Sequence, residues 1–212
     1  MKKRLLVLSV ALAILMSASA AYAVGEQGFV KTAYDAIMNK DYITAVENYS
    51  KAIEKQADYA PSYYGRGLAY SYLGKLNESN TDFQKAVEID AKYHQAYYGM
   101  GLNYTKLGKY SDAAAAFKKA VELAPKNSGY YYACANAHAY LQQNDKALVA
   151  YTKSIELDPN NGLAYYGRAV IHKISGRGDS ALADFDKYLA LNGNNDNLEA
   201  AVIRLKKEIT AK

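Results

Sequence analysis

Aromatic and small residues return along this chain at a fixed interval of 34 residues. The pattern occurs five times without insertion, in copies that begin at Glu26, Ala60, His94, Ser128 and Gly162. A fixed period of this length indicates stacked supersecondary units that share one continuous core. The sequence therefore predicts a repeat array from residue 26 to residue 195.

The size of the side chain at each place in the unit indicates what a unit is. Rings fill position 4 (Phe29, Tyr63, Tyr97, Tyr131, Tyr165) and position 24 (Tyr49, Phe83, Phe117, Tyr151, Phe185). Small residues fill position 8 (Ala33, Gly67, Gly101, Ala135, Ala169) and position 20 (Ala45, Ser79, Ala113, Ala147, Ala181). Helices packed about 8–10 Å apart need small residues where their axes come closest and large ones beside that point. Each unit is therefore predicted to be a pair of helices.

Residues that end and begin helices recur with the same period. Position 15 holds Gly74, Gly108 and Gly176, where a left-handed residue is expected to end the first helix. Position 18 holds Asn77, Ser111, Asp145 and Asp179, which we expect to accept hydrogen bonds from the free amides of the second helix. Pro125 and Pro159 at position 32 then stop that helix.

The units resemble tetratricopeptide repeats, whose pattern is an aromatic at 4, Gly or Ala at 8, Tyr at 11, Ala at 20, an aromatic at 24, Ala at 27 and Pro at 32. Departures include Ala36, His138 and His172 at position 11 and Tyr188 at position 27. The resemblance implies an all-α fold, a right-handed α-solenoid of five 34-residue helical hairpins. Its repeats would span 26–59, 60–93, 94–127, 128–161 and 162–195.

The pattern changes after Asn195. Leu198, Val202, Leu205 and Ile209 fall on one side of a predicted helix in residues 196–212. We expect this to be a capping helix, because the last unit of an array leaves an apolar face that must be covered. Residues 24–212 would then form one elongated domain.

The first residues have the features of an export signal. Three basic residues precede an apolar run, and Ala21-Tyr22-Ala23 follows as a cleavage site, so residues 1–23 are interpreted as a signal peptide. An uncleaved membrane anchor is the alternative, since the uncharged stretch is just long enough to span a bilayer. In either case the repeats are expected to be exported, to the periplasm or the medium, and after cleavage no membrane contact is expected.

Charge and reactive residues exclude several classes of function. Removal of residues 1–23 lowers the net charge from +5 to +2, and no basic stripe supports nucleic acid binding. Cys134 is the sole cysteine and has no predicted base beside it. His138 and His172 share a column in adjacent units, roughly 10 Å apart, which is too far for one metal ion. We therefore expect no enzyme activity, no metal site and no cofactor.

By the resemblance, positions 2, 5, 9, 12 and 13 point into a concave groove. The predicted protein-binding residues are Tyr34, Tyr64, Leu68, Tyr72, Tyr98, Leu102, Lys106, Tyr132, Asn136, Tyr140, Tyr166 and Lys173. The same positions also hold Val30, Ile37, Met38, Val170 and Ile174. Tyrosines offer large contact area at low entropic cost, which suits a protein or peptide partner, although the tyrosines at position 5 are also compatible with helix packing.

Some members of the family hold a carboxylate with cations at positions 2, 5 and 6. Here position 6 of the second to fifth repeats, where the clamp would need it, holds Gly65, Gly99, Ala133 and Gly167, so that clamp is not expected. The leading hypothesis is a non-enzymatic scaffold or adaptor that binds a protein segment in the tyrosine-rich groove. The alternative is a structural protein that self-assembles into a homo-oligomer through its ends or its convex face.

Overall fold

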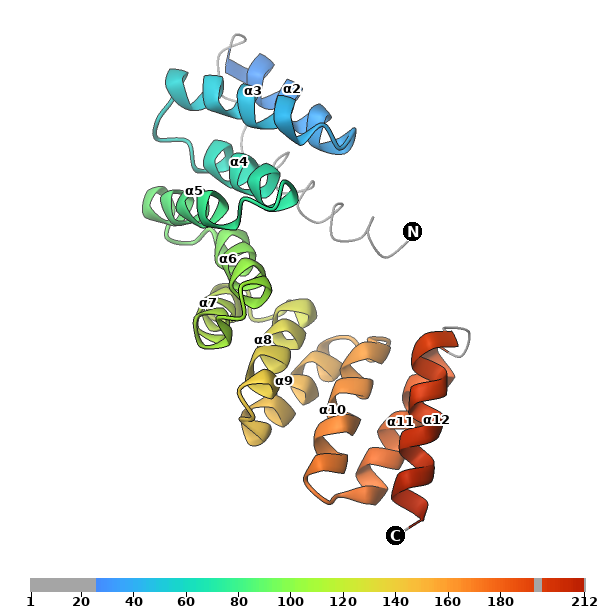
Figure 1. Cartoon of the computed structure of the whole chain (residues 1–212). Coiled ribbons are helices and arrows are strands. Elements are labelled where there is room, and N and C mark those ends of the chain that lie inside the picture. The colour runs from blue at the N-terminus through green and yellow to red at the C-terminus, as the bar shows by residue number, and fades with distance from the viewer. Residues whose placement is uncertain (1–25, 193–195, 212) are drawn as a thin grey trace. The chain divides into compact units, whose positions relative to one another are not determined.

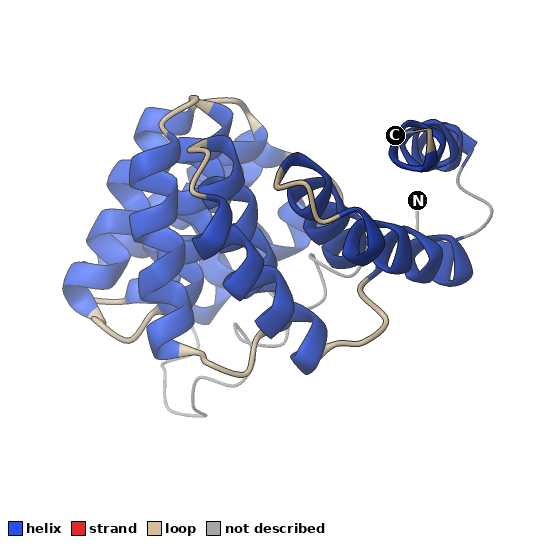
Figure 2. Ribbon diagram, turned by 90° about the horizontal axis from the view of Figure 1, so that it is seen from below, coloured by secondary structure: helices blue, strands red, loops and turns tan. Residues whose placement is uncertain are grey.

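The computed structural model describes residues 26–192 and 196–211, and within these ranges every regular element is a helix (Figures 1 and 2). The first helices of the five repeats are α2 (Glu26–Met38), α4 (Ala60–Tyr72), α6 (His94–Lys106), α8 (Ser128–Tyr140) and α10 (Gly162–Ile174). The second helices are α3 (Tyr42–Lys55), α5 (Leu76–Ile89), α7 (Tyr110–Leu123), α9 (Asn144–Leu157) and α11 (Gly178–Asn192). The last helix is α12 (Asp196–Thr210). The predicted signal peptide lies outside the described residues.

Every first helix begins at the first residue of a predicted repeat and is 13 residues long. In the first, second, fourth and fifth repeats the second helix packs beside the first one, as the neighbouring ribbons of α4 and α5 or α8 and α9 show (Figure 1). This confirms the predicted all-α fold of helix pairs. None of the described helices is long and apolar enough to cross a membrane.

The chain divides into two compact units with the boundary between Asn103 and Tyr104, inside α6. The first unit contains α2 to α5 and most of α6, and the second contains the end of α6 and α7 to α12. Each unit has its own buried hydrophobic clusters.

The core of the first unit forms where small residues face a ring. Ala33, Ala45 and Ala69 are buried around Tyr49, together with Ala36 and Ile37. A buried polar cluster lies beside it: Asn103 donates to the hydroxyl of Ser79 at 2.8 Å and accepts from that of Ser71 at 2.8 Å. The amide of Asn103 is thus satisfied without water, as a fully buried polar group requires.

The core of the second unit repeats this design. One cluster contains Ala135, Ala147, Ala164 and Tyr151, and a second contains Phe185, Tyr188 and Val202. Val202 belongs to α12, and Leu198, Leu205 and Ile209 pack around it on the last repeat. The predicted apolar side of the capping helix is therefore the side that is buried.

The turns within the repeats confirm one prediction and extend it. Gly74, Gly108 and Gly176 have φ of 77°, 71° and 72°, the left-handed conformation predicted for position 15. Lys40 and Gln142 occupy position 15 of the other two repeats and have φ of 62° and 56°. All five repeats therefore end the first helix in the same way, with or without glycine.

The predicted caps of the second helices are wrong. The second helix begins one residue before position 18, so Asn77 and its equivalents lie inside the first turn and the capping residue is at position 16. Asp41 caps α3 by accepting from the amide of Thr44 at 3.1 Å. Lys75, Lys109 and Gln143 at the same position make no side-chain cap. These helices depend on tertiary packing instead.

Candidate functional site

The tyrosine at position 5 of the second repeat is not available to a partner. Tyr64 is 5% exposed, and its ring centroid lies 5.7 Å from that of Phe83 and 5.1 Å from that of Tyr93. The prediction that Tyr64 lines a binding groove is therefore corrected, because neighbouring rings cover it. Tyr98, at the same position of the third repeat, is half-buried.

In the second unit the position-5 tyrosines also pack on rings. The centroid of Tyr132 lies 6.1 Å from that of Tyr151, and the centroid of Tyr166 lies 6.1 Å from Phe185 and 5.5 Å from Tyr188. Both tyrosines are half-buried. Their contact with position 24 of the same repeat indicates that packing takes much of the ring surface.

Position 9 is mixed in character. Tyr34 and Leu68 are half-buried, whereas Leu102 is exposed. Asn136 accepts a hydrogen bond from the hydroxyl of Tyr151 at 2.5 Å, so its carbonyl is engaged within the repeat. Position 9 therefore offers a partner only part of the surface that was predicted for it.

Position 13, at the end of each first helix, is the most exposed part of the predicted set. Met38 and Tyr72 are 43% and 45% exposed in the first unit, and Tyr140 and Ile174 are 61% and 67% exposed in the second. We name these four residues the position-13 column. Within each unit the two members come from first helices that contact each other, α2 with α4 and α8 with α10. Lys106 holds this position in the third repeat and is also exposed.

Two members of the column are held by ring stacking. Tyr72 stacks on Tyr42 with a centroid distance of 4.7 Å and an interplanar angle of 12°, and Tyr140 stacks on Tyr110 at 4.4 Å and 11°. Tyr42 and Tyr110 both occupy position 17 of the preceding repeat, which was not among the predicted positions. The sequence does contain an indication of them, because tyrosine occurs at position 17 in both the first and the third repeat.

The remaining predicted residue, Lys173, is held by the capping helix. Its ammonium group lies 2.7 Å from the carboxylate of Glu208 in α12, so its charge is neutralised within the second unit. A second ion pair joins Lys206 of α12 to Asp186. Lys173 is consequently a weaker candidate for contact with a partner than the column beside it.

The glycines at position 6 explain why a carboxylate clamp does not fit here. A Cβ atom at Gly65 would lie 2.2 Å from Cζ of Tyr49, and one at Gly167 would lie 2.5 Å from Cζ of Tyr151. The ring at position 24 of the preceding repeat therefore occupies the space that a larger residue at position 6 would need.

Two arginines at position 7 fill an equivalent site in two repeats. Arg66 donates two hydrogen bonds to Asp82, both at 2.8 Å, and one to the hydroxyl of Ser50 at 3.0 Å. Arg168 makes the same contacts with Asp184 and Thr152 at the same distances. Each guanidinium also lies 5.7 Å from the ring at position 4, Tyr63 or Tyr165.

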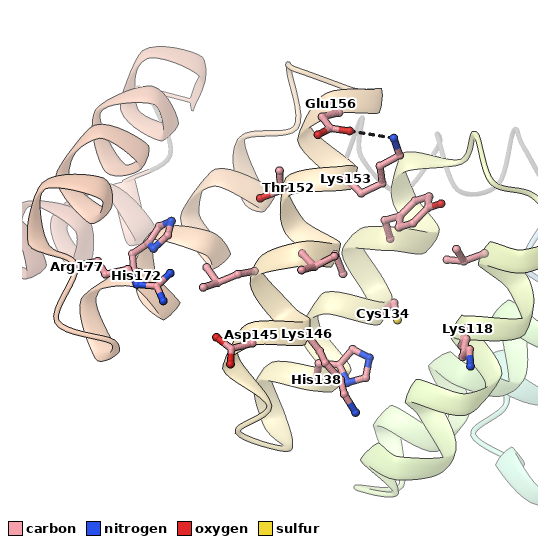
Figure 3. Close-up of a pocket in the computed structure, with 15 residues that line it drawn as sticks. Lys118, Cys134, His138, Asp145, Lys146, Thr152, Lys153, Glu156, His172 and Arg177 are labelled. Atoms are coloured by element: carbon pink, nitrogen blue, oxygen red, sulfur yellow. Dashed lines mark hydrogen bonds and ion pairs between the residues drawn. The ribbon is translucent and has the colours of Figure 1, made fainter.

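The fourth repeat lacks this arrangement, and a concavity of about 850 Å³ in total extends there over α9, from Lys118 and Cys134 on one side to His172 and Arg177 on the other (Figure 3). Cys134 stands where the arginines stand, Ala150 stands where the aspartates stand, and both line the concavity together with Tyr131 (Figure 3). Lys118 of α7 lies across from Cys134 (Figure 3). Sequence reasoning missed this site, although the paired loss of the arginine and the aspartate is visible in the repeat columns.

The cysteine and the histidines that line the concavity are partly or fully buried or hydrogen-bonded. Burial raises the pKa of Cys134 to about 11, so its thiol stays protonated at neutral pH. His138 bonds through Nδ1 to Gln143 at 2.8 Å, and burial lowers the pKa of His172. Among the described side chains, no group of three or more His, Cys, Asp or Glu could hold a metal ion.

Comparison with solved structures finds the same fold. Crystal structures of MamA match with 22% identity and a TM-score of 0.73, over 77% of this chain and 96% of that one. MamA from Desulfovibrio magneticus RS-1 matches with 19% identity and a TM-score of 0.76, over 84% and 100%. YrrB, a TPR protein with an unusual peptide-binding site, matches with 23% identity and a TM-score of 0.72, over 84% and 90%.

Comparison with curated proteins finds no match. The tetratricopeptide repeat family matches residues 60–93, 94–127 and 128–161, in the register of the helix pairs, and also residues 150–183. Together these matches cover more than half of the chain. With helix pairs in the same register and solved structures of the same fold, the chain belongs to the tetratricopeptide repeat family.

Proposed function

We propose that this protein is a non-enzymatic scaffold that binds a segment of a partner protein along its first helices, with the position-13 column as the main contact surface. The observation that carries the proposal is the exposure of a large apolar or aromatic side chain at the same position in four of five repeats. Exposed apolar side chains that recur on neighbouring helices are typical of an interaction surface.

The stacked tyrosine pairs support a peptide as the partner. A ring fixed by a neighbour loses little entropy when a partner binds, and its hydroxyl can still form hydrogen bonds. Leu102 and the exposed face of Tyr34, both at position 9, would extend the surface toward the other end of the first helices. The similarity to YrrB, which has a peptide-binding site, also supports a peptide partner.

The test is site-specific photocrosslinking in cells. A photoreactive amino acid at position 72 or 140 should capture one recurrent partner protein. Ile43 and Ile203 are matched controls, because each is large, apolar and 64% or 45% exposed but lies outside the column. Capture of the same partner from the controls with equal yield would refute the proposed surface.

The alternative, self-assembly through the ends or the convex face, predicts a different crosslinking pattern. Positions 43 and 203 would then capture a second copy of the chain, and sedimentation of the purified protein would show association that depends on concentration. Truncation before Asp196 would change that association if α12 forms the contact.

We also propose that the protein acts after export, since residues 1–23 have the features of a signal peptide. The mass of the protein purified from its native cells tests this directly. A chain that begins at Val24 would support export with cleavage, and a full-length chain in the cytoplasm would refute it.

A further inference from the structure

We propose that the concavity of the fourth repeat, lined by Tyr131, Cys134 and Ala150, is a binding site for a small amphipathic carboxylate. This site lies apart from the position-13 column and does not depend on the function proposed above. A side chain of the protein fills the same place in other repeats, whereas here space is left and cations lie around it.

In the second and fifth repeats this place is filled from within the chain. The guanidinium of Arg66 or Arg168 occupies it, covers the ring at position 4 and pairs with a buried aspartate. The third repeat carries Met100 at position 7, and this long apolar side chain is buried.

In the fourth repeat the arginine and the aspartate are lost together. Cys134 and Ala150 are far smaller than the residues they replace, while the ring of Tyr131 is retained at position 4. Apolar side chains surround the space, since Val121, Leu148 and Val149 also line it. A site with this lining favours an apolar group over the cation that fills the equivalent place elsewhere.

The charges at the rim favour an anion. Lys118, Lys146, Lys153 and Arg177 line the concavity, against the two carboxylates of Asp145 and Glu156. Lys118 and Lys153 each pair with a glutamate of their own helix, at 3.8 and 2.9 Å. Both pairs are exposed, so they contribute little and can be exchanged for contact with a ligand.

The electrostatics of the thiol agree with the position of Lys118. Burial raises the pKa of Cys134, and Lys118 opposes this shift, in the direction that favours an anion. Figure 3 shows Lys118 on one side of Cys134, with His138 and Lys146 near the end of α8. A carboxylate whose apolar body lies over Cys134 and Ala150 would thus reach these ammonium groups.

The sole cysteine of the chain makes the test direct, because alkylation of Cys134 reports occupancy of this site alone. Octanoate is the probe, and octan-1-ol and octylammonium are controls with the same apolar body. We expect octanoate to slow alkylation by about fivefold or more at saturation, and octylammonium to have no effect. Equal protection by all three compounds, or protection by neither octanoate nor a peptide with a free carboxylate, would overturn the proposal.

The carboxylate could belong to a free small molecule or to the C-terminus of a polypeptide, and a second probe distinguishes these sources. Acetyl-Leu-Leu-Leu with a free carboxylate is compared with its C-terminal amide. Protection by octanoate but not by the peptide assigns the site to small molecules. Protection by the peptide but not by its amide or by octanoate assigns it to a chain terminus.

Variants that fill the site supply the structural control. C134R/A150D rebuilds the arginine–aspartate pair of the second and fifth repeats with no change in net charge, and C134M copies the third repeat. Calorimetry should show loss of octanoate binding in both, with helical circular dichroism unchanged. Binding that survives in both folded variants would place the ligand elsewhere and overturn the proposal.

The rim charges are tested separately with K118Q/K146Q. This variant should keep its fold and bind octanoate about tenfold more weakly. That change corresponds to a loss of roughly 1.4 kcal/mol of binding free energy. Crosslinking from position 140 should be unchanged in C134M. Unchanged crosslinking in C134M would show that loss of octanoate binding does not affect the position-13 column, so the two proposals can be tested separately.

Discussion

The first two repeats and the last two repeats contain the same internal arrangement in two separate units. Tyr49 faces Gly65 in the first unit as Tyr151 faces Gly167 in the second, and Arg66 pairs with Asp82 as Arg168 pairs with Asp184. One contact differs. The hydroxyl of Tyr151 donates to Asn136, whereas the buried hydroxyl of Tyr49 has no partner among the described residues.

The difference shows which columns tolerate change. Rings and glycines that interlock are kept in both units, because loss of either leaves a cavity or a clash. Polar residues around them vary, and position 9 holds Tyr34 in one unit and Asn136 in the other. The fourth repeat, like the third, has neither the arginine nor the aspartate, but it carries the smaller Cys134 where the third has Met100, and we propose that this leaves space for a ligand.

The largest effect is expected from breaking one arginine–aspartate pair. Arg66→Met or Arg168→Met leaves a buried carboxylate without its partner and should cost about 3 kcal/mol or more. R66M/D82A and R168M/D184A should each cost about 1 kcal/mol or less, because they copy the third repeat, which has Met100 and Ala116. Urea unfolding measures the free energy of unfolding of the single and the double variants. Equal costs for single and double variants would contradict this explanation.

Gly65→Ala and Gly167→Ala should each destabilise their unit by about 2 kcal/mol, because the new methyl group meets a buried tyrosine ring at 2.2 or 2.5 Å. Gly28→Ala is the matched control. Among the described residues, no atom outside the local helix backbone lies within 4 Å of a Cβ placed there, so this variant should gain about 0.5–1 kcal/mol from helix propensity. Thermal melts that show no difference between Gly65→Ala and Gly28→Ala would mean that the ring is not fixed.

The two buried tyrosines should respond to the same substitution with opposite signs. Tyr49→Phe removes a hydroxyl that has no partner and should stabilise the first unit by about 1 kcal/mol. Tyr151→Phe removes the donor to Asn136 and should destabilise the second unit by about 1 kcal/mol. The denaturant concentration at the midpoint of unfolding, measured for each variant and for the unchanged protein, gives the sign of each effect. The same sign for both would remove the distinction drawn between the units.

The smallest effect concerns pH. Burial lowers the pKa of His94 in the first unit and of His172 in the second. The unfolded chain therefore binds more protons just below pH 6.5, so stability should fall as the pH drops from about 7 to 5. H94Q and H172Q should each flatten this dependence. A decline of the same slope in the double variant would assign it to other groups.

Much of the fold could be predicted from the repeat columns, because the interlocking of rings and small residues appears directly in the sequence. The left-handed residues at Lys40 and Gln142 could not, since neither residue type favours that conformation and the repeat geometry imposes it. The capping prediction failed because Lys75, Lys109 and Gln143 precede their helices without a side-chain bond.

The candidate surface was only partly predictable. The family's groove positions include both position 5 and position 13, and sequence alone does not distinguish them. Tyr64 is covered because Phe83 and Tyr93 reach it, whereas Tyr140 stacks on Tyr110 and is still 61% exposed. The concavity at Cys134 depends on the combined volume of side chains from several helices. The residue types at one repeat position do not indicate that volume.

The central claim is that position 13 binds a partner while position 5 packs the repeat. The most direct test compares Tyr140→Ala with Tyr132→Ala, both scored for capture by a photoreactive group at position 174 and for unfolding in urea. Tyr140→Ala should abolish capture and leave the free energy of unfolding nearly unchanged, because its ring is largely exposed. Tyr132→Ala should lower that free energy and keep capture. The reverse pattern would contradict the account and return the binding surface to the position-5 tyrosines.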